Sequence, residues 1–385
     1  MKTTALTYLA AAAALLAASA EVSAQGAATD PAAAWPNKPV RFVVPFTAGS
    51  ATDAVARIVG ERLGAQLGQN FVVENRPGAG GTIGMAVVSK ANPDGYTILV
   101  HSSSYTVTPT TYPNAPYDTL RDFRGITPLA NLPNVLVIAP SKGIRSVKDL
   151  VTAAKARPGT LTYASAGAGS ATQLNAERFR LGAGFEGVHV PFKGTPEALT
   201  DVVTGRVDIY FCPVISVLQF LKEGRVLGLA VGSTRRSTVL PDLPTTLEAG
   251  IPNSDYNFWV GMAVPSKTAR GIVARLHQST QKSLQTPDLA ERMAKLGAEQ
   301  MLMTPQEFDA YIKAEIKINA ALVKAAGIQV NRSYAFAAAA RNVRAHAGQT
   351  PTSGVPIFRS ACLESARALR ASSFRQRSKP GTAGG

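Results

Sequence analysis

Residues 39–57 read PVRFVVPFTAGSATDAVAR, and this stretch passes from an apolar run through a turn of small residues into an amphipathic pattern. The apolar run at 40–46 predicts a buried β-strand. Beyond the turn, apolar side chains recur at helical spacing along one stripe: Val55, Ile58, Val59, Leu63 and Leu67. Thr52 or Asp53 is placed to cap this helix, and Gly68 to end it. The stretch therefore predicts a strand–turn–helix unit.

The same alternation of strand and helix continues toward the C-terminus. Residues 71–74 and 97–101 are predicted as strands, with a helix at 83–90 between them. A Gly-rich turn at 77–81 precedes this helix. A β–α–β–α–β series of this kind predicts parallel pairing of the strands with right-handed crossovers.

A second α/β series begins near residue 135. Its strands are predicted at 135–139, 161–165, 187–192, 207–211 and 227–232. Its helices are predicted at 147–156, 172–181, 196–204 and 214–221. A strand at 258–264 and helices between 268 and 326 complete the pattern. The two series together predict two α/β lobes.

The first 24 residues have the pattern of a secretory signal peptide. Lys2 precedes an Ala- and Leu-rich run at 5–20, and Val22-Ser23-Ala24 has the small–x–small form of a cleavage site. The apolar run is shorter than the about 20 residues that a transmembrane helix needs, which disfavours a retained anchor. We therefore expect an exported, periplasmic protein that is cut after Ala24, with a flexible Ala- and Pro-rich leader at 25–37.

Basic charge is concentrated at the C-terminus. Residues 331–385 hold nine of the 40 Lys and Arg residues but one of the 25 acidic residues, Glu364. Elsewhere the cations are scattered among acids, without the concentrated patch that nucleic-acid binding requires, so no nucleic-acid partner is expected. The tail has two interpretations: a basic arm for a membrane or nucleic acid, or a disordered segment translated from a shifted reading frame. The second is favoured because an exported protein has no evident use for such an arm and the pattern of the body ends near Val330.

The sequence contains no motif for catalysis, a cofactor or a metal. Cys212 and Cys362 are the two cysteines, no disulfide is predicted between them, and no Cys or His cluster has metal-ligand spacing. The G-x-S-x-G motif of a nucleophile elbow is absent. His189 lies in an apolar strand, which is typical of a core histidine. We therefore expect a protein that is not an enzyme and has no metal or cofactor, with a hydrolytic triad assembled in space as the alternative.

Two segments, FTAGSATD at 46–53 and SAGAGSATQ at 165–173, each lead from a strand through small residues into a helix. Free backbone N–H groups and the positive end of the helix dipole attract anions at such a point. Glycine lets the backbone approach a ligand closely. Each segment alone is better explained as a tight turn with capping residues. The second lacks the third glycine and the acidic residue of a dinucleotide-binding fingerprint.

Short segments along nearly the whole body carry a family resemblance. They include PVRFVVPFTAGSATDAVAR at 39–57, VENRPGAGGTIG at 73–84, PDGYTIL at 93–99, YDTLRDF at 117–123, HVPFKG at 189–194, GRVD at 205–208, LAVGS at 229–233, PDLPTTLEAG at 241–250 and KAAGI at 324–328. In their order and combination they resemble the Bug family, the solute-binding components of tripartite tricarboxylate transporters. The resemblance covers about residues 36–330.

The resemblance implies a two-lobed α/β fold of the type II-like Venus-flytrap class, in which each lobe is a mixed sheet flanked by helices. Lobe one would comprise 38–134 and 258–330, and lobe two 135–257. The two loops would face each other across a cleft and hold a ligand carboxylate through amides and hydroxyls. The implied ligand-binding residues are Phe46, Thr47, Ala48, Gly49, Ser50, Thr52, Asp53, Ser102, Ser103, Ser165, Gly167, Ser170, Thr172, Gln173, Gly194, Thr195 and Asp208.

The function that the resemblance implies is capture of a small mono- or dicarboxylate by a monomeric protein for the permease subunits of a tripartite transporter. A ligand-sensing accessory of a membrane signalling protein is the alternative. The chain departs from the family at three places. The first loop has Thr47-Ala48-Gly49-Ser50-Ala51 where consecutive glycines are usual, Gln173 replaces a common His, and Cys212 replaces a frequent acidic residue. The last change weakens the case for an amino-acid ligand.

Overall fold

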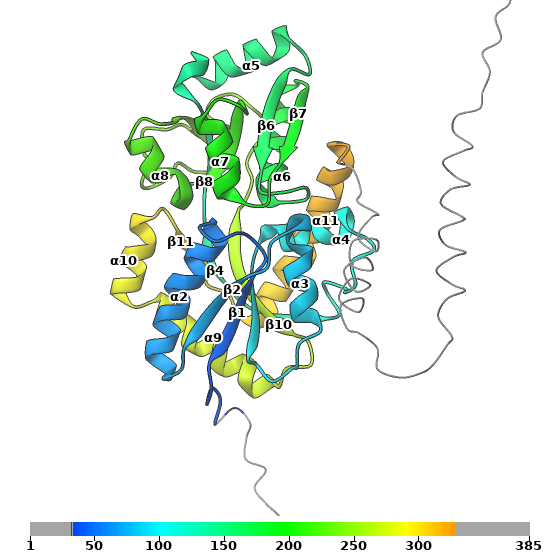
Figure 1. The fold of residues 1–385 in the computed structure, drawn as a ribbon, viewed down its shortest axis with the longest axis vertical. Coiled ribbons are helices and arrows are strands. Elements are labelled where there is room, and N and C mark those ends of the chain that lie inside the picture. Colours follow the sequence, from blue (N-terminus) through cyan, green and yellow to red (C-terminus); the bar gives the residue numbers. More distant parts are fainter. Residues whose placement is uncertain (1–31, 33, 329–385) are drawn as a thin grey trace, which may run out of the picture. The chain divides into compact units, whose positions relative to one another are not determined.

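The computed structural model describes residue 32 and residues 34–328. These residues form two β-sheets, each flanked by its own helices (Figure 1). The predicted signal peptide, the tail at 331–385 and Cys362 lie outside the described residues. None of the described helices is both long enough and apolar enough to cross a membrane.

The first sheet has the strand order β11-β4-β10-β3-β1-β2. In chain order the strands are β1 (Val40–Val44), β2 (Phe71–Asn75), β3 (Thr97–Ser102), β4 (Phe123–Asn131), β10 (Trp259–Pro265) and β11 (Glu299–Gln300). The strand β1 pairs in parallel with β2 and with β3, which confirms the parallel series predicted from the first hundred residues. The later strands β10 and β4 extend this sheet in antiparallel fashion.

Helices cover both faces of the first sheet. They are α2 (Ala51–Leu67), α3 (Thr82–Ser89), α4 (Thr108–Thr111), α9 (Arg270–Leu284), α10 (Pro287–Lys295) and α11 (Pro305–Ala325). Alternating side chains of β1 point to opposite faces, as the two-residue period of a strand requires. Phe42 and Val44 pack in one core cluster with α2 and α9, while Val43 packs in another with α3 and α11.

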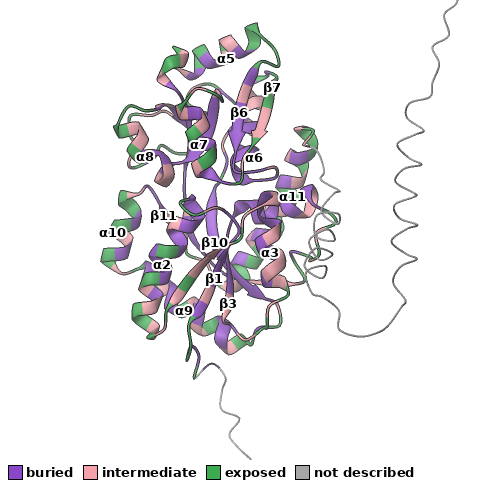
Figure 2. Ribbon diagram, viewed as in Figure 1, coloured by how far each residue is buried: buried purple, intermediate pink, exposed green. Residues whose placement is uncertain are grey.

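The second sheet has the strand order β7-β6-β8-β5-β9. Its strands are β5 (Asn134–Ile138), β6 (Leu161–Ser165), β7 (Gly187–Pro191), β8 (Ile209–Pro213) and β9 (Leu227–Val231). Its helices are α5 (Val147–Ala156), α6 (Ala171–Ala183), α7 (Thr195–Val203) and α8 (Val214–Lys222). Two core clusters, one on each face, fill the space between sheet and helices. The purple interior of each helix–sheet group in Figure 2 corresponds to these cores.

The predicted arrangement of two lobes, each a mixed sheet flanked by helices, is confirmed. The chain passes from the first sheet to the second between β4 and β5, and returns between β9 and β10. Strands of the first sheet lie within 40–131 and 259–300, and those of the second within 134–231. The boundaries at 134/135 and 257/258 remain a prediction.

Among the local differences from the sequence analysis, two have a clear physical reason. The strand β4 was not predicted, because Pro128 and Gly125 within it argue against a strand. Its pairing with β10 contains register shifts beside both residues, and these irregularities accommodate them. The other difference is Trp35, which was assigned to the flexible leader. It is 2% exposed and belongs to the core cluster of lobe one, so the ordered body begins before residue 38.

Candidate functional site

An identical pentapeptide, Ala-Gly-Ser-Ala-Thr, occurs at 48–52 and at 168–172. Each copy follows a strand next to the edge of its sheet, β1 or β6, and opens a long helix, α2 in lobe one and α6 in lobe two. The glycines have φ angles of 79° at Gly49 and 76° at Gly169, in the left-handed region that favours glycine. The two copies therefore present the same backbone turn from opposite lobes.

The hydrogen bonds of the two copies also match. Ser50 caps α2 by accepting from the backbone N–H of Asp53 at 3.3 Å, and Ser170 caps α6 by accepting from that of Gln173 at 3.3 Å. The sequence analysis had placed the first cap at Thr52 or Asp53, two or three residues too late. Serine at the cap position satisfies one of the free N–H groups of the first turn and leaves the others available.

The side chain of the third residue of each helix turns back and accepts a hydrogen bond from the glycine of the preceding loop. Gly49 donates its N–H to Asp53 Oδ2 at 2.9 Å, and Gly169 donates its N–H to Gln173 Oε1 at 2.8 Å. The side chains of Asp53 and Gln173 therefore stabilise the backbone conformation of the two loops. This explains why neither side chain lines the space between the lobes.

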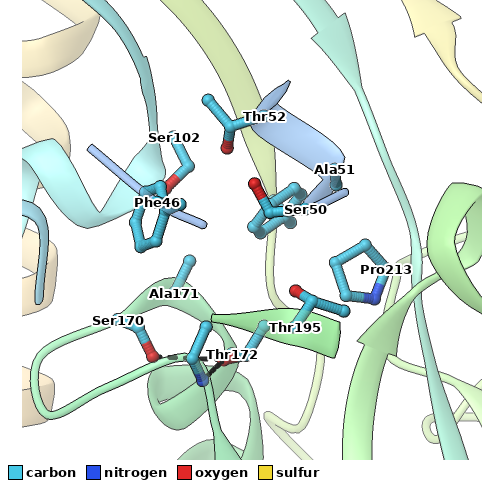
Figure 3. Close-up of a pocket in the computed structure, with 12 residues that line it drawn as sticks. Phe46, Ser50, Ala51, Thr52, Ser102, Ser170, Ala171, Thr172, Thr195 and Pro213 are labelled. Carbon is cyan, nitrogen blue, oxygen red and sulfur yellow. Dashed lines mark hydrogen bonds between the residues drawn. The ribbon is translucent and has the colours of Figure 1, made fainter. Parts of the chain in front are cut away.

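The two helix N-termini line one narrow cavity. Its wall consists of Phe46, Ser50, Ala51, Thr52, Ser102, Ala166, Ser170, Ala171, Thr172, Thr195, Pro213 and Phe258. Figure 3 shows the residues of the α2 N-terminus facing those of α6, with Thr195 beside them. The cavity lies beyond the carboxyl ends of parallel strands in both sheets, where α/β folds bind ligands.

A third helix contributes its N-terminus to the same cavity. Thr195 is the first residue of α7, and its cap residue Gly194 has no side chain to accept from the helix. The cavity wall thus combines six hydroxyl side chains with apolar ones and contains no ionisable side chain. Three helix dipoles and their free N–H groups supply a positive potential there, which suits a small anion.

The cavity brings together seven of the residues predicted for ligand binding, and they come from both lobes. They are Phe46, Ser50, Thr52, Ser102, Ser170, Thr172 and Thr195. The other ten do not line it: Thr47, Ala48, Gly49, Asp53, Ser103, Ser165, Gly167, Gln173, Gly194 and Asp208. Most of these belong to the loops behind the lining residues.

Two acidic residues that were predicted to bind the ligand make hydrogen bonds within the protein instead. The Asp53 carboxylate accepts from Gly49, Arg57 and Asn75. Burial alone would raise the pKa of Asp53, but these hydrogen bonds outweigh burial and hold its pKa below the usual range. Asp208 accepts from Lys142 and Thr162. Burial would raise the pKa of Asp208, but these hydrogen bonds outweigh burial and lower it. Asp208 joins β6 to the start of β8, away from the cavity wall.

Ser165 and His189 form the one serine–histidine pair next to the second loop. Ser165 Oγ lies 2.6 Å from His189 Nε2, and burial lowers the pKa of His189 to about 4. Ser165 is fully buried and accepts from the N–H of Gly167 at 3.1 Å. The nearby Glu177 carboxylate binds Tyr163 and Arg180. The pair therefore fixes the loop from inside and offers no nucleophile to the cavity, which disfavours the hydrolytic alternative.

The lobes touch each other around the cavity. Tyr112 of lobe one donates to the carbonyl of Ala168 in lobe two at 3.0 Å. On another side Thr47 Oγ1 donates to Glu197 Oε2 at 3.2 Å. A Cβ on Gly80 would lie 2.4 Å from the Ala168 oxygen, so the loops approach closely only because this residue is glycine. The structure is thus a closed form of the two lobes.

Five lining residues were missing from the predicted list: Ala51, Ala166, Ala171, Pro213 and Phe258. The repeated pentapeptide is the sequence signal that would have identified Ala51 and Ala171. Pro213 ends β8, and Phe258 precedes β10. Their approach to the loops depends on how distant strands pair, and no local pattern indicates it.

Among the described residues, no group of three or more His, Cys, Asp or Glu side chains is arranged to hold a metal ion. Cys212 is buried in β8 without a disulfide partner in the described part of the chain. Its side chain belongs to the core cluster against α7 and α8 and does not line the cavity.

Comparison with known proteins identifies the family. Residues 55–328 match the model of the tripartite tricarboxylate transporter family receptor. The protein BugT of Bordetella pertussis is 34% identical over 298 residues, which cover 77% of this chain and 91% of BugT. The periplasmic binding protein BugD has a similar structure, with a TM-score of 0.73 and 34% identity over 77% of this chain and 99% of BugD. R. palustris Rpa4515 with adipate has a TM-score of 0.75 and 33% identity over 77% of this chain and 99% of that protein.

Proposed function

Because the chain belongs to the tripartite tricarboxylate transporter receptor family, as its resemblance to the Bug proteins predicted, we propose that it captures a small mono- or dicarboxylate in the periplasm. The observation that carries the proposal is the cavity between two identical Ala-Gly-Ser-Ala-Thr loops. The adipate in the Rpa4515 structure supports the same ligand class.

The chemistry of the cavity fits a carboxylate. A carboxylate only accepts hydrogen bonds, and hydroxyls together with helix N-terminal N–H groups are donors that match it. Because the donors are neutral, the site needs no buried lysine or arginine. A buried charge of that kind would be costly to desolvate while the site is empty. The apolar part of the wall, which includes Phe46, Phe258 and Pro213, suits the hydrocarbon part of the ligand.

The same features support binding without chemical conversion. The cavity wall has no general base, and Ser165 and His189 are committed to the loop framework. In this proposal the protein is exported with cleavage after Ala24, acts as a monomer, and hands its ligand to the membrane permease subunits of a tripartite transporter. It needs no cofactor and does not bind nucleic acid.

A thermal-shift screen of the exported protein tests the proposed function. Adipate, succinate, malate and propionate are compared with adipamide and glucose, which match their size without a negative charge. At least one carboxylate should raise the melting temperature progressively with concentration, because a ligand present at about 100 times its Kd stabilises by about 2.7 kcal/mol. Stabilisation by adipamide or glucose, with none of the carboxylates active, would contradict the proposal.

A further inference from the structure

Tyr210 lies directly behind the cavity and donates to one of its hydroxyls. It sits in β8, between β5 and β6, and is fully buried on the face that packs against α7. Its hydroxyl donates to Thr195 Oγ1 at 3.2 Å and also interacts with the Thr172 side chain. Tyr210 has no part in the cavity wall itself, and nothing in its local sequence distinguishes it from a core aromatic.

Three of the six hydroxyls of the cavity share one pattern of hydrogen bonding. Ser50 accepts from the N–H of Asp53, Ser170 from that of Gln173, and Thr172 from that of Ala166 at 3.0 Å. In each case a donor of the protein occupies a lone pair of the oxygen. Because a hydroxyl has one hydrogen and two lone pairs, this occupation favours turning the hydrogen away from the donor. Ser170 Oγ and Thr172 Oγ1 lie 3.1 Å apart, so one of their two hydrogens lies in the bond between them and the other is left for the cavity.

Thr195 completes the pattern with a different donor. As the first residue of α7 it has no backbone N–H placed to hold its oxygen, and Gly194 supplies no capping side chain. The Tyr210 hydroxyl takes this role. Burial raises the pKa of Tyr210 far above its usual value, so the phenol stays protonated and remains a donor at any physiological pH. Within the described residues no acceptor is assigned to the Thr195 hydrogen.

We propose that Tyr210 is a positioning residue for ligand recognition: by donating to Thr195 Oγ1, it aims the Thr195 hydrogen into the cavity as a donor to the ligand carboxylate. This inference rests on the proposed function, because it assumes that the cavity holds a carboxylate. It adds a residue from the centre of the second sheet to those that determine affinity.

The test is a double-mutant cycle between Tyr210→Phe and Thr195→Val. Affinity is measured by calorimetric titration with whichever of adipate, succinate, malate or propionate stabilises the unmodified protein most. Tyr210→Phe should weaken binding about fivefold, as expected for the loss of one neutral hydrogen bond. Thr195→Val should weaken binding at least about tenfold, because it removes a hydrogen bond to the charged ligand. The loss of affinity in the double variant should be clearly smaller than the product of the two single losses, because Tyr210 acts mainly through Thr195 although it also contacts Thr172.

Two further variants separate positioning from structure. In a Thr195→Ser background the hydroxyl is retained, and Tyr210→Phe should again cost about fivefold in affinity. Tyr105→Phe removes the hydroxyl of another buried tyrosine, whose partner is the Thr119 carbonyl, and should leave affinity unchanged. Wild-type affinity in Tyr210→Phe, or losses that multiply in the double variant, would overturn the inference while leaving the proposed function intact. If no carboxylate binds the unmodified protein, the proposed function and this inference fail together.

Discussion

Replacement of Ser170 by Asp should abolish carboxylate binding without lowering the melting temperature of the ligand-free protein. Ser170 caps α6 and lines the cavity. Aspartate caps helices as well as serine does, and its charge is favourable at a helix N-terminus. The same charge would repel the ligand. At about 4 Å and an effective dielectric constant of about 20, two like charges repel by about 4 kcal/mol, so affinity should fall by a factor of about 100 to 1,000.

Two controls isolate the charge. Ser170→Asn has nearly the shape of Ser170→Asp and also caps a helix, but it is neutral, so it should retain most of the affinity. Ser146→Asp makes the same change at the cap of α5, which does not reach the cavity, and should leave binding unchanged. Calorimetric titration with adipate or malate measures all three. Undiminished binding by Ser170→Asp would mean that the anion lies elsewhere.

Replacement of Gly194 by Ala should prevent the lobes from closing around the ligand. An added Cβ would lie 1.8 Å from Thr47 Oγ1, which belongs to the opposite lobe. The backbone of Gly194 is extended, with φ of −174°, so alanine itself introduces no strain there. Crowding of this kind costs about 1–3 kcal/mol, and because the conflict arises only in the closed form, affinity should fall by roughly 5- to 150-fold.

A second substitution checks the cause of this loss. Thr47→Ala removes the atom that the new methyl group would meet, so the double variant should recover much of the affinity. Thr47→Ala alone removes the exposed bond to Glu197 and should cost about threefold or less. Affinity and melting temperature of the ligand-free form are measured together. A Gly194→Ala protein that binds like the wild type, or one that is destabilised without ligand, would contradict the closed packing described for the two loops.

Much of the site could be predicted from sequence because its two halves are local structures. A strand, a turn of small residues and a helix are encoded within about 15 residues, and both loops were recognised on that basis. The pentapeptide that repeats at 48–52 and 168–172 is equally visible in the sequence. It was not recognised as a repeat, although it identifies Ala51 and Ala171 and the serine caps directly.

The rest of the site depends on contacts between distant segments. Asp208 and Gln173 have side chains that could bind a ligand, but strand pairing brings Thr162 beside Asp208, and the loop turns the Gly169 N–H onto Gln173. Phe258 reaches the cavity from the segment that returns to lobe one before β10. The strand β4, with Pro128 in its middle, likewise forms only because β10 pairs with it irregularly. Local propensity contains none of this information.

The most direct test of carboxylate binding between the two loops is a backbone amide NMR titration of the exported protein with adipate. If the helix N-termini of α2 and α6 hold the carboxylate, the largest shifts should fall on the amides of residues 50–52 and 170–172, with Thr195 of α7 also affected. Two results would contradict this site. One is a set of shifts confined to another surface, such as the groove lined by Arg124, Arg270 and His277. The other is the absence of shifts at ligand concentrations that stabilise the protein.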